Sequence, residues 1–496
     1  MNGVLLGIDI GTSACKTAAF SQEGALLNQA ERAYPVDYPQ PGFAQQHPDT
    51  WWAAAQETIR DILGQGVRPE SILGVAVSGQ SWAAVLVDKA GKALLPTPIW
   101  TDSRATRECA DILRLMPGDA LFTISGNPLQ PGYAFPKLLW YKRHRADAYR
   151  QAAAVLQSNG FIAYRLTGTI SQDRSQGYGF CCYNIHQGAW DKALCRALGV
   201  RAELLPDLVD SQARVGEVTA QAARETGLLQ GTPVFAGGLD AACGTLGVGV
   251  IQPGQAQEQG GQAGGMSICA DHPRAHPKLI LGNHVVPGRY LLQGGTTGGG
   301  GAMKWLREAF CPGLGFPEMD ALAATVPAGC EGLSFLPYLA GERSPLWLPG
   351  AKGAFYGLDY ATGLGHLIRA VMEGVAFSLR HNLETAAQAG LTAQVLRATG
   401  GSAKSPIWVQ IKADATGIPM EVPTSGADSA LGAALIAGVG AGVYADFEEA
   451  TRRTLKPGTL TAPDSGQAAA YEQAYRRYRE LSDRLLPLMG REGEGT

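Results

Sequence analysis

Short apolar runs separated by polar turns fill the first ninety positions, and this pattern predicts a β-sheet with one helix inserted. Strands are expected at residues 4–10, 15–20, 25–33 and 72–78. The last run is apolar throughout, which is typical of a central strand buried on both faces. A helix is expected from Thr50, with Asp49 as its N-cap.

The strand–turn–strand pattern of the opening residues returns past Gly249. Residues 255–260 and 266–270 predict a second hairpin, and the turn between them runs from Gly261 to Gly264. A repeat that starts again halfway predicts two domains of related architecture, residues 1–249 and 250–496. Helices are expected in the second domain at residues 302–310, 364–388, 405–416, 430–438 and 467–486.

The composition is that of a globular protein with large cores, because 45% of the 496 residues are hydrophobic. The formal net charge of −3 argues against a nucleic-acid or polybasic membrane partner. The longest uncharged apolar stretch, residues 431–445, is shorter than the roughly 18–20 residues of a membrane-spanning helix. We therefore expect a cytoplasmic protein. The nine cysteines form no CxxC pair and are expected to be buried and reduced.

An acid at the end of the first strand is the sharpest local signal. Asp9 is followed by Gly11, Thr12 and Ser13, a turn whose N–H and O–H groups can bind a phosphate chain. Asp9 can hold a hydrated Mg²⁺, and Lys16 returns a positive charge towards the same phosphates. An ordinary hairpin with a solvated acid explains the motif equally well.

A second acid, Asp240, follows the strand predicted at residues 233–236 and a glycine pair. A carboxylate in such a turn can serve as general base for a hydroxyl. It can also be a helix N-cap.

Glycine-rich loops precede two helices of the second half. They begin at Gly298 and at Gly400, and loop-to-helix junctions of this kind can bind nucleotide phosphates. Flexible surface loops are the simpler interpretation of either loop in isolation. Neither GxGxxG nor GxxxxGK[ST] occurs in the sequence, which excludes the Rossmann and P-loop fingerprints. Trp82 follows the strand end at Ser78, where it could face a cleft or lie in the core.

Several segments, taken in chain order, resemble the FGGY family of carbohydrate kinases. They are LGIDIGTSACKTAAF, VSGQSWAAVLVD, PIWTDSR, GGLDAACGTLGVGV, GLSFLPYLAGERSP and RATGGSAKSPIWVQIKADATGIP. The segments PGFAQQHPDTWW and AYRLTG resemble the xylulokinase branch. The resemblance implies an α/β fold of two actin-like (ribonuclease H-like) ATPase domains. These would close over ATP and a sugar in a central cleft.

The resemblance also implies roles for the matching residues. Asp9 would bind the metal ion, Mg²⁺, and Asp240 would be the catalytic base beside the substrate. The sugar would contact Gln80, Ser81 and Trp82 as well as Asp240. The ATP-binding residues would be Gly11, Thr12, Ser13, Lys16, Gly261, Gln262, Gly300, Gly401, Ser402 and Ser405.

The sequence departs from the family pattern in three places. Gln262 and Ala263 stand where the family commonly has Thr and Ser, so two hydroxyl donors are missing from the second turn. Ser81 and Trp82 stand where xylulokinases usually have Met and His, and Ala241 stands where Asn normally follows the base. The last two changes remove polar groups expected to bind sugar hydroxyls.

The resemblance therefore implies ATP-dependent phosphorylation of a ketose hydroxyl, first of all that of a pentulose such as D-xylulose. Another ketose, a polyol or an aldonic acid such as gluconate is the alternative substrate. A catalytically weakened regulatory protein that binds ATP or sugar is a third possibility, favoured by Gln262 and Ala263. The expected partner is a small sugar, and a homodimer is left open.

Overall fold

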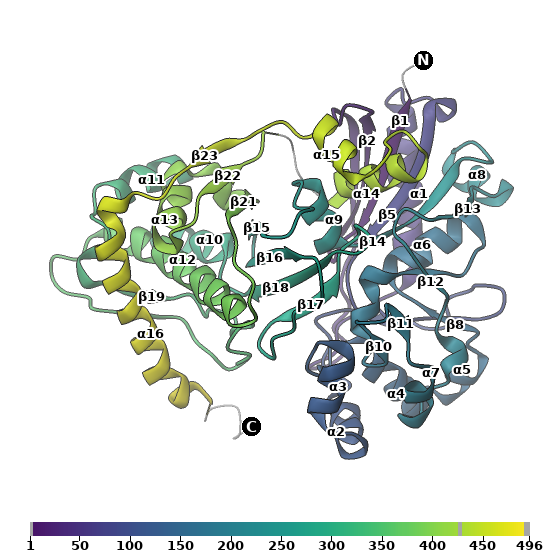
Figure 1. Ribbon diagram of the computed structural model, residues 1–496, viewed down its shortest axis with the longest axis horizontal. Coiled ribbons are helices and arrows are strands. Elements are labelled where there is room, and N and C mark those ends of the chain that lie inside the picture. The colour runs from purple at the N-terminus through teal and green to yellow at the C-terminus, as the bar shows by residue number, and fades with distance from the viewer. Residues whose placement is uncertain (1–2, 425–428, 491–496) are drawn as a thin grey trace.

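Two α/β units face each other in the computed structural model, which describes residues 3–424 and 429–490 (Figure 1). The N-terminal unit contains a six-stranded sheet in the order β13-β14-β5-β1-β2-β3. Its strands are β1 Val4–Ile10, β2 Ala14–Ser21, β3 Leu26–Ala33, β5 Ile72–Gly79, β13 Arg214–Glu217 and β14 Pro233–Leu239.

The C-terminal unit contains a seven-stranded sheet in the order β17-β18-β16-β15-β21-β22-β23. Its strands are β15 Gln255–Gly260, β16 Gly264–Ala270, β17 Ile280–Asn283, β18 Tyr290–Thr296, β21 Val395–Thr399, β22 Met420–Val422 and β23 Thr459–Thr461.

The two sheets share a topology, which confirms the duplication predicted from the hydrophobic pattern. In the first sheet β1 pairs antiparallel with β2 and parallel with β5. In the second sheet β15 pairs antiparallel with β16 and parallel with β21. In each sheet a third antiparallel strand lies beyond the hairpin and a further parallel strand lies beyond the crossover. This is the actin-like arrangement expected from the resemblance.

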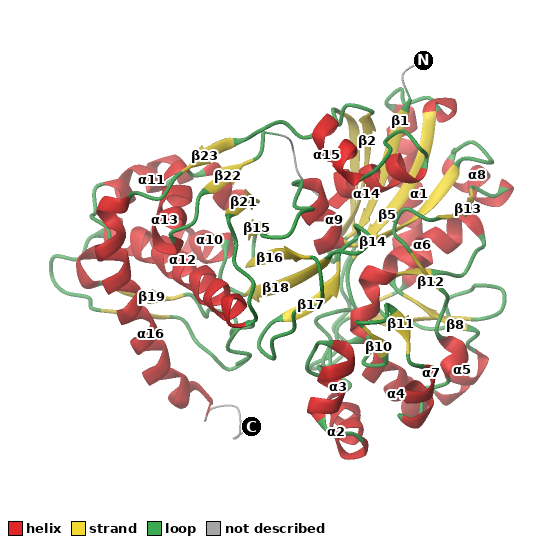
Figure 2. Ribbon diagram, viewed as in Figure 1, coloured by secondary structure: helices red, strands yellow, loops and turns green. Residues whose placement is uncertain are grey.

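Helices cover both faces of the N-terminal sheet (Figure 2). Side chains alternate along β5, so Val75 and Val77 pack with Ile59 of α1 (Pro48–Gly64), whereas Ala76 packs with Ala433 of α14 (Ser429–Gly440) on the opposite face. The main helices of this unit are α1 Pro48–Gly64, α2 Thr106–Leu115, α4 Ala134–His144, α6 Ser158–Thr167, α8 Ala220–Thr226 and α9 Asp240–Gly247.

Two helices late in the chain return to the N-terminal unit. The helices α14 Ser429–Gly440 and α15 Phe447–Thr454 lie beside β1 and β2 in space (Figure 1). At Gly7 of β1, an added Cβ would lie 1.9 Å from the carbonyl oxygen of Ala430, so only glycine lets α14 approach this closely. The division expected at residue 249 therefore follows chain order, while residues 429–454 pack with the first unit.

Apart from α11 (Phe316–Ala324), which the sequence pattern did not predict, the helices of the second unit follow the predicted pattern closely. They are α10 Gly300–Phe310, α11 Phe316–Ala324, α12 Leu364–Gln388, α13 Pro406–Thr416 and α16 Ala468–Gly490. One cap was predicted wrongly: α1 begins at Pro48, and its N-cap is His47 rather than Asp49. The His47 ring accepts a hydrogen bond from the Asp49 N–H, and proline suits the first helical position. All nine cysteines are buried and free, as predicted.

Candidate active site

A cavity of about 510 Å³ lies in the cleft and is lined by residues of both units. Six of the residues predicted from sequence share it: Asp9, Thr12, Ser81, Trp82, Asp240 and Gly261. The remaining polar and aromatic lining comes from segments far apart in the sequence, at Trp100, Tyr178, Gln257, Gln259, Ser267, Gln293, Arg343, Thr399 and Ser429.

Asp9 lies at the carboxyl end of β1, where the parallel strand β5 also ends. The register pairs Asp9 with Ser78, and the Ser78 hydroxyl donates a 2.8 Å hydrogen bond to Asp9 Oδ1. Lys16 is directly opposite Asp9 on β2, so both side chains emerge on the same face of the sheet. Lys16 itself is absent from the cavity lining.

The backbone of the first turn, residues 11–13, is fixed by side chains that donate hydrogen bonds to its carbonyl groups. Tyr34 donates to the Gly11 carbonyl at 2.7 Å, and Gln46 donates to the Thr12 carbonyl at 2.8 Å. Within the described residues, the N–H groups of Thr12 and Ser13 have no protein acceptor. These free amides suit a phosphate oxygen.

Asp240 is positioned by an irregularity in β14. The pairing of β14 with β5 shifts between Phe235 and Gly238, and Gly237 adopts a φ of +72°. A Cβ at Gly237 would lie 1.8 Å from the Val77 carbonyl oxygen, which explains the glycine. Asp240 is the first residue of α9, not its N-cap, and its Oδ1 accepts from the Ala241 N–H at 2.7 Å.

Two further contacts fix the backbone around Asp240. The Leu239 N–H donates to Ser175 Oγ at 2.9 Å, so the Ser175 hydroxyl proton is free to be donated to Asp173. Asp173 is buried without an ion pair in the described chain, and Asn159 also donates to it at 2.7 Å. On the other side, Ser429 donates to the Asp240 carbonyl at 2.9 Å. The carboxyl group of Asp240 is therefore held at a defined place in the cleft.

The protonation of Asp240 is poised near neutral pH. Burial raises the pKa of its carboxyl group, and the negative charge of Asp9 raises it further, to about 7. A carboxyl group with such a pKa can accept a proton at physiological pH and is suited to general-base work.

Trp82 lies both in the cavity wall and in an aromatic cluster. Its ring centroid is 4.6 Å from that of Tyr133 and 5.8 Å from that of Tyr178, and only 7% of the residue is exposed. Trp82 has a φ of +61°, uncommon for a bulky residue. The buried Lys137 ammonium holds this segment by donating to the carbonyls of Trp82 and Ile99, at 2.9 and 2.7 Å.

Gln80 is absent from the cavity lining, and its contact with the sugar stays a prediction. Its side chain is fully buried, and its amide donates to Gln46 Oε1 at 2.9 Å and to the Gly11 carbonyl at 3.3 Å. These contacts make Gln80 a support for the first turn. The neighbouring Ser81 does line the cavity.

The second turn connects β15 to β16 and packs against the start of α10. Gly300 and Gly301 donate their N–H groups to the carbonyls of Gly261 and Gln262, at 2.7 and 2.9 Å. Gly300 is therefore engaged by the turn and is outside the cavity lining. The Gln262 side chain is exposed and lies beside Gly301, where an added Cβ would be 2.4 Å from its Nε2.

The loop before α13 contributes only Gly400 to the cavity lining. Ser402 is buried, and its hydroxyl accepts from the Lys412 ammonium at 2.6 Å. Ser405 is the N-cap of α13 and accepts from the backbone N–H three residues on. Both hydroxyls therefore have partners within the protein, and their binding of ATP stays a prediction. Gly401 is exposed at the edge of the loop.

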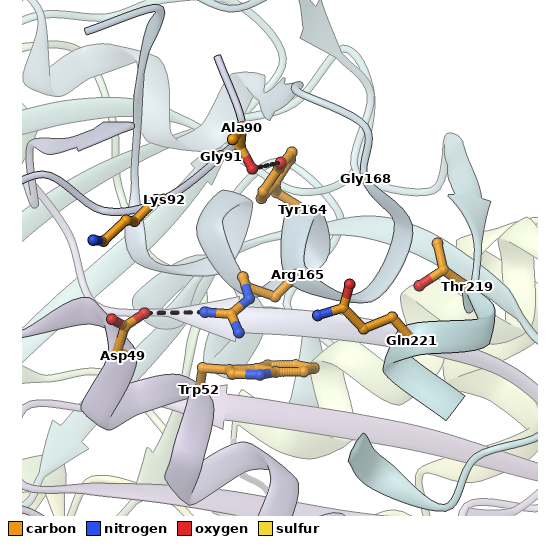
Figure 3. A pocket seen from close by; sticks show the side chains of 10 residues that line it. All are labelled: Asp49, Trp52, Ala90, Gly91, Lys92, Tyr164, Arg165, Gly168, Thr219 and Gln221. Atoms are coloured by element: carbon orange, nitrogen blue, oxygen red, sulfur yellow. Dashed lines mark hydrogen bonds and ion pairs between the residues drawn. The ribbon is translucent and has the colours of Figure 1, made fainter. Parts of the chain in front are cut away.

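A second cavity, of about 530 Å³, lies on the N-terminal unit and contains none of the predicted site residues (Figure 3). The Arg165 guanidinium lies over the Trp52 ring, 5.0 Å from its centroid, and pairs with Asp49 at 3.0 Å. The Arg165 cation therefore already has a carboxylate partner.

The described residues lack two features, a metal-binding cluster and a membrane-spanning helix. They contain no cluster of three or more histidine, cysteine, aspartate or glutamate side chains able to enclose a metal ion. Mg²⁺ in phosphoryl-transfer sites is typically held by only one or two carboxylates together with substrate phosphates, so it does not require such a cluster. In the same residues, no helix combines the length and apolar character needed to cross a membrane.

Comparison with known proteins places these features in a family. Models of the FGGY family of carbohydrate kinases match residues 4–247 with their N-terminal domain and residues 270–441 with their C-terminal domain. The chain therefore belongs to the FGGY family of carbohydrate kinases.

The similar proteins cover almost the whole chain. The xylulose kinase of Bacillus subtilis (strain 168) is 29% identical, with 96% of each chain covered. The L-xylulose/3-keto-L-gulonate kinase of Escherichia coli (strain K12) is 30% identical, with 99% of each covered. The crystal structure of xylulose kinase from Rhodospirillum rubrum superposes with a TM-score of 0.91 at 30% identity, covering 98% of this chain and 99% of that one. The protein is a xylulokinase-like carbohydrate kinase.

Proposed function

We propose that this kinase transfers the γ-phosphoryl group of ATP to a hydroxyl of a pentulose such as D-xylulose. The observation that carries the proposal is the shared cavity of Asp9, Asp240 and the first turn. Phosphoryl transfer requires a positioned hydroxyl, a base for its proton and neutralisation of phosphate charge. These groups meet within one cleft.

In this proposal Asp240 accepts the proton of the attacking hydroxyl. Its pKa of about 7 leaves a useful fraction ionised at neutral pH while keeping it basic. The anchors at Leu239 and at the Asp240 carbonyl keep the carboxyl group in place, so little reorganisation accompanies proton transfer.

Asp9 would hold Mg²⁺, and the amides of Thr12 and Ser13 would bind phosphate oxygens. Their fit rests on the free N–H groups of the turn and on a carboxylate at the strand end. Mg²⁺ supplies charge neutralisation for the phosphates when bound. Lys16, opposite Asp9 in the ladder, would add a further positive charge, and Gly261 would line the nucleotide path.

Trp82 and Ser81 would form the sugar end of the cavity. The indole offers an apolar face for sugar C–H groups, worth on the order of 1 kcal/mol. Its N–H has no hydrogen-bond partner within the described residues. A small ketose is favoured over a larger sugar because this wall is filled by Trp82 and Tyr178.

A second substrate class is favoured by one comparison. The Escherichia coli relative named for both L-xylulose and 3-keto-L-gulonate is as similar as the xylulose kinases. Because Trp82 and Ala241 replace polar groups usual in the xylulokinase branch, a different ketose, a polyol or an aldonic acid is the alternative substrate.

A coupled ADP-release assay over a panel of sugars tests the proposal. The panel contains D-xylulose, L-xylulose, D-ribulose, xylitol, gluconate and a 3-keto sugar acid, each with and without Mg²⁺. We expect the highest kcat/KM with a pentulose and loss of turnover in EDTA. Highest activity with an acid would assign the alternative class, and binding of ATP and sugar without turnover would identify a regulatory binding protein.

A further inference from the structure

Among the described residues that line the cavity in the cleft, Arg343 is the single basic side chain. The other charged groups of this described lining are the carboxylates of Asp9 and Asp240. Two carboxylates and a triphosphate would concentrate negative charge in this space, so any cation there has a large electrostatic effect. Arg343 comes from the C-terminal unit, in the loop between β19 Ser334–Leu336 and β20 Ala354–Tyr356.

Arg343 has no carboxylate partner in the part of the chain that the structure describes. The adjacent Glu342 uses its Oε1 to accept backbone N–H groups, from Thr297 at 2.9 Å and from Arg343 at 2.7 Å. Burial lowers the pKa of the Arg343 guanidinium, yet arginine remains protonated in proteins. A buried charge without a partner is costly, and such a group is usually satisfied by a ligand.

Arg343 is connected to the first turn through Trp100. Its Cζ is 5.5 Å from the Trp100 ring centroid, and Trp100 donates to Thr12 Oγ1 at 2.8 Å. The guanidinium also crosses β18 at Gly295, where an added Cβ would be 2.9 Å from Cζ. One indole ring therefore separates the guanidinium from the predicted phosphate-binding turn.

Tyr178 lies near both Arg343 and the base, Asp240. Burial is the main cause that raises the pKa of the Tyr178 phenol; the negative charge of Asp240 raises this pKa further, and the positive charge of Arg343 lowers it. Tyr178 also lines the cavity. The cation thus faces the space between the base and the first turn from the opposite unit.

We propose that Arg343 is a catalytic residue, whose guanidinium binds the phosphoryl group during transfer and neutralises its developing charge. The inference rests on the proposed kinase function. In the transfer, the sugar hydroxyl oxygen forms a bond to the γ-phosphorus while the bond from that phosphorus to the β–γ bridging oxygen breaks. The bridging oxygen leaves with the electron pair on ADP, and Asp240 takes the hydroxyl proton. A planar guanidinium can donate two hydrogen bonds to phosphoryl oxygens throughout.

The test compares Arg343→Gln and Arg343→Lys with a matched control. Arg145 lies outside the cleft with its Cζ also 5.5 Å from a tryptophan ring, that of Trp140, so Arg145→Gln removes an equivalent cation–π contact. With the best substrate of the wild type, we expect Arg343→Gln to lose about 10³-fold in kcat, on the scale of other arginines in phosphoryl transfer. The kcat of Arg343→Lys should lie between those of the wild type and Arg343→Gln, because lysine keeps the positive charge but lacks the planar, two-donor guanidinium. Arg145→Gln should remain close to wild type.

A binding measurement gives a readout independent of turnover. ADP with aluminium fluoride and the sugar mimics the transferring phosphoryl group, whereas a non-hydrolysable ATP analogue mimics the ground state. Arg343→Gln should weaken the fluoride complex about 100-fold or more and the analogue less than about tenfold, since the guanidinium acts mainly in the transition state. If Arg343→Gln does not fold, Arg343→Lys decides the question on the same two ligands.

Three results would overturn the inference. Near-wild-type turnover in the folded Arg343 variants would remove the role of Arg343 and leave the kinase function intact. A defect confined to KM for acidic sugars would show that Arg343 binds a substrate carboxylate instead. Absence of turnover by the wild type on the whole panel would overturn both the kinase function and this role.

Discussion

Replacing Asp240 by Asn should abolish most catalysis and at the same time stabilise the ligand-free protein at alkaline pH. The amide keeps the shape of the side chain but accepts no proton. General-base catalysis is typically worth about 10²–10⁴ in rate, so kcat should fall by that factor while Mg²⁺–ATP binding survives. The wild-type rate should rise with pH through about 7, because only ionised Asp240 is a base.

The stability effect follows from the same pKa. An ordinary Asp titrates near 3.8, whereas burial and the charge of Asp9 raise the pKa of Asp240 to about 7 in the folded state. Between these values the folded protein binds more protons than the unfolded chain, so the free energy of unfolding falls as pH rises. At about 1.4 kcal/mol per pKa unit the loss is at most about 4 kcal/mol, and solvent in the open cleft reduces it. Asp240→Asn removes this penalty.

Thermal unfolding in EDTA at pH 5 and pH 8, without nucleotide or sugar, measures the difference. We expect Asp240→Asn to unfold a few degrees higher than wild type at pH 8, about 2–6 °C, and to differ less at pH 5. Asp207→Asn, an exposed site outside the cleft, is the control and should change neither turnover nor the pH dependence. An Asp240→Asn protein with near-wild-type turnover would refute the base assignment. One that is no more stable at pH 8 would refute the electrostatic argument.

Three further changes test the rest of the site. Asp9→Asn should weaken Mg²⁺–ATP binding, measured by calorimetry. It also removes a charge that raises the pKa of Asp240, so the acid limb of the pH–rate profile of the residual activity should shift to lower pH. An acid limb at the wild-type pH would contradict this. Trp82→His should change the order of kcat/KM among sugars while ATP affinity stays constant, and an unchanged order would place Trp82 in the aromatic core alone. Gln262→Thr combined with Ala263→Ser should tighten ATP binding about two- to tenfold per productive donor. Unchanged or weaker ATP binding would indicate that the Gln262 amide already donates a hydrogen bond to a phosphate oxygen.

Two features of the site could be predicted from the sequence because they depend on local patterns. The apolar runs before Asp9 and in β14 fix two strand ends, and parallel strands that end together place their terminal side chains at one sheet edge. Strand periodicity and glycine turns depend on neighbouring residues, so they can be recognised in the sequence. The recurrence of the hairpin at β15 and β16 therefore predicted the duplicated fold.

The identity of hydrogen-bond partners was beyond local patterns. Gln80, Ser402 and Ser405 occur in motif-like segments, yet their polar groups are used by Gln46, Lys412 and the α13 backbone. A short polar side chain binds whichever partner the fold brings within 3 Å, and two of these partners come from other segments of the chain.

The sequence by itself determined the two sheets, the hairpin turns and the acids at their strand ends. Only the tertiary structure decided which side chains complete the cleft. Trp100, Tyr178 and Arg343 come from segments separated by at least seventy residues in the sequence, and their meeting depends on how two units pack. The raised pKa of Asp240 has the same origin, because desolvation and the charge of Asp9 exist only once distant segments enclose the cavity.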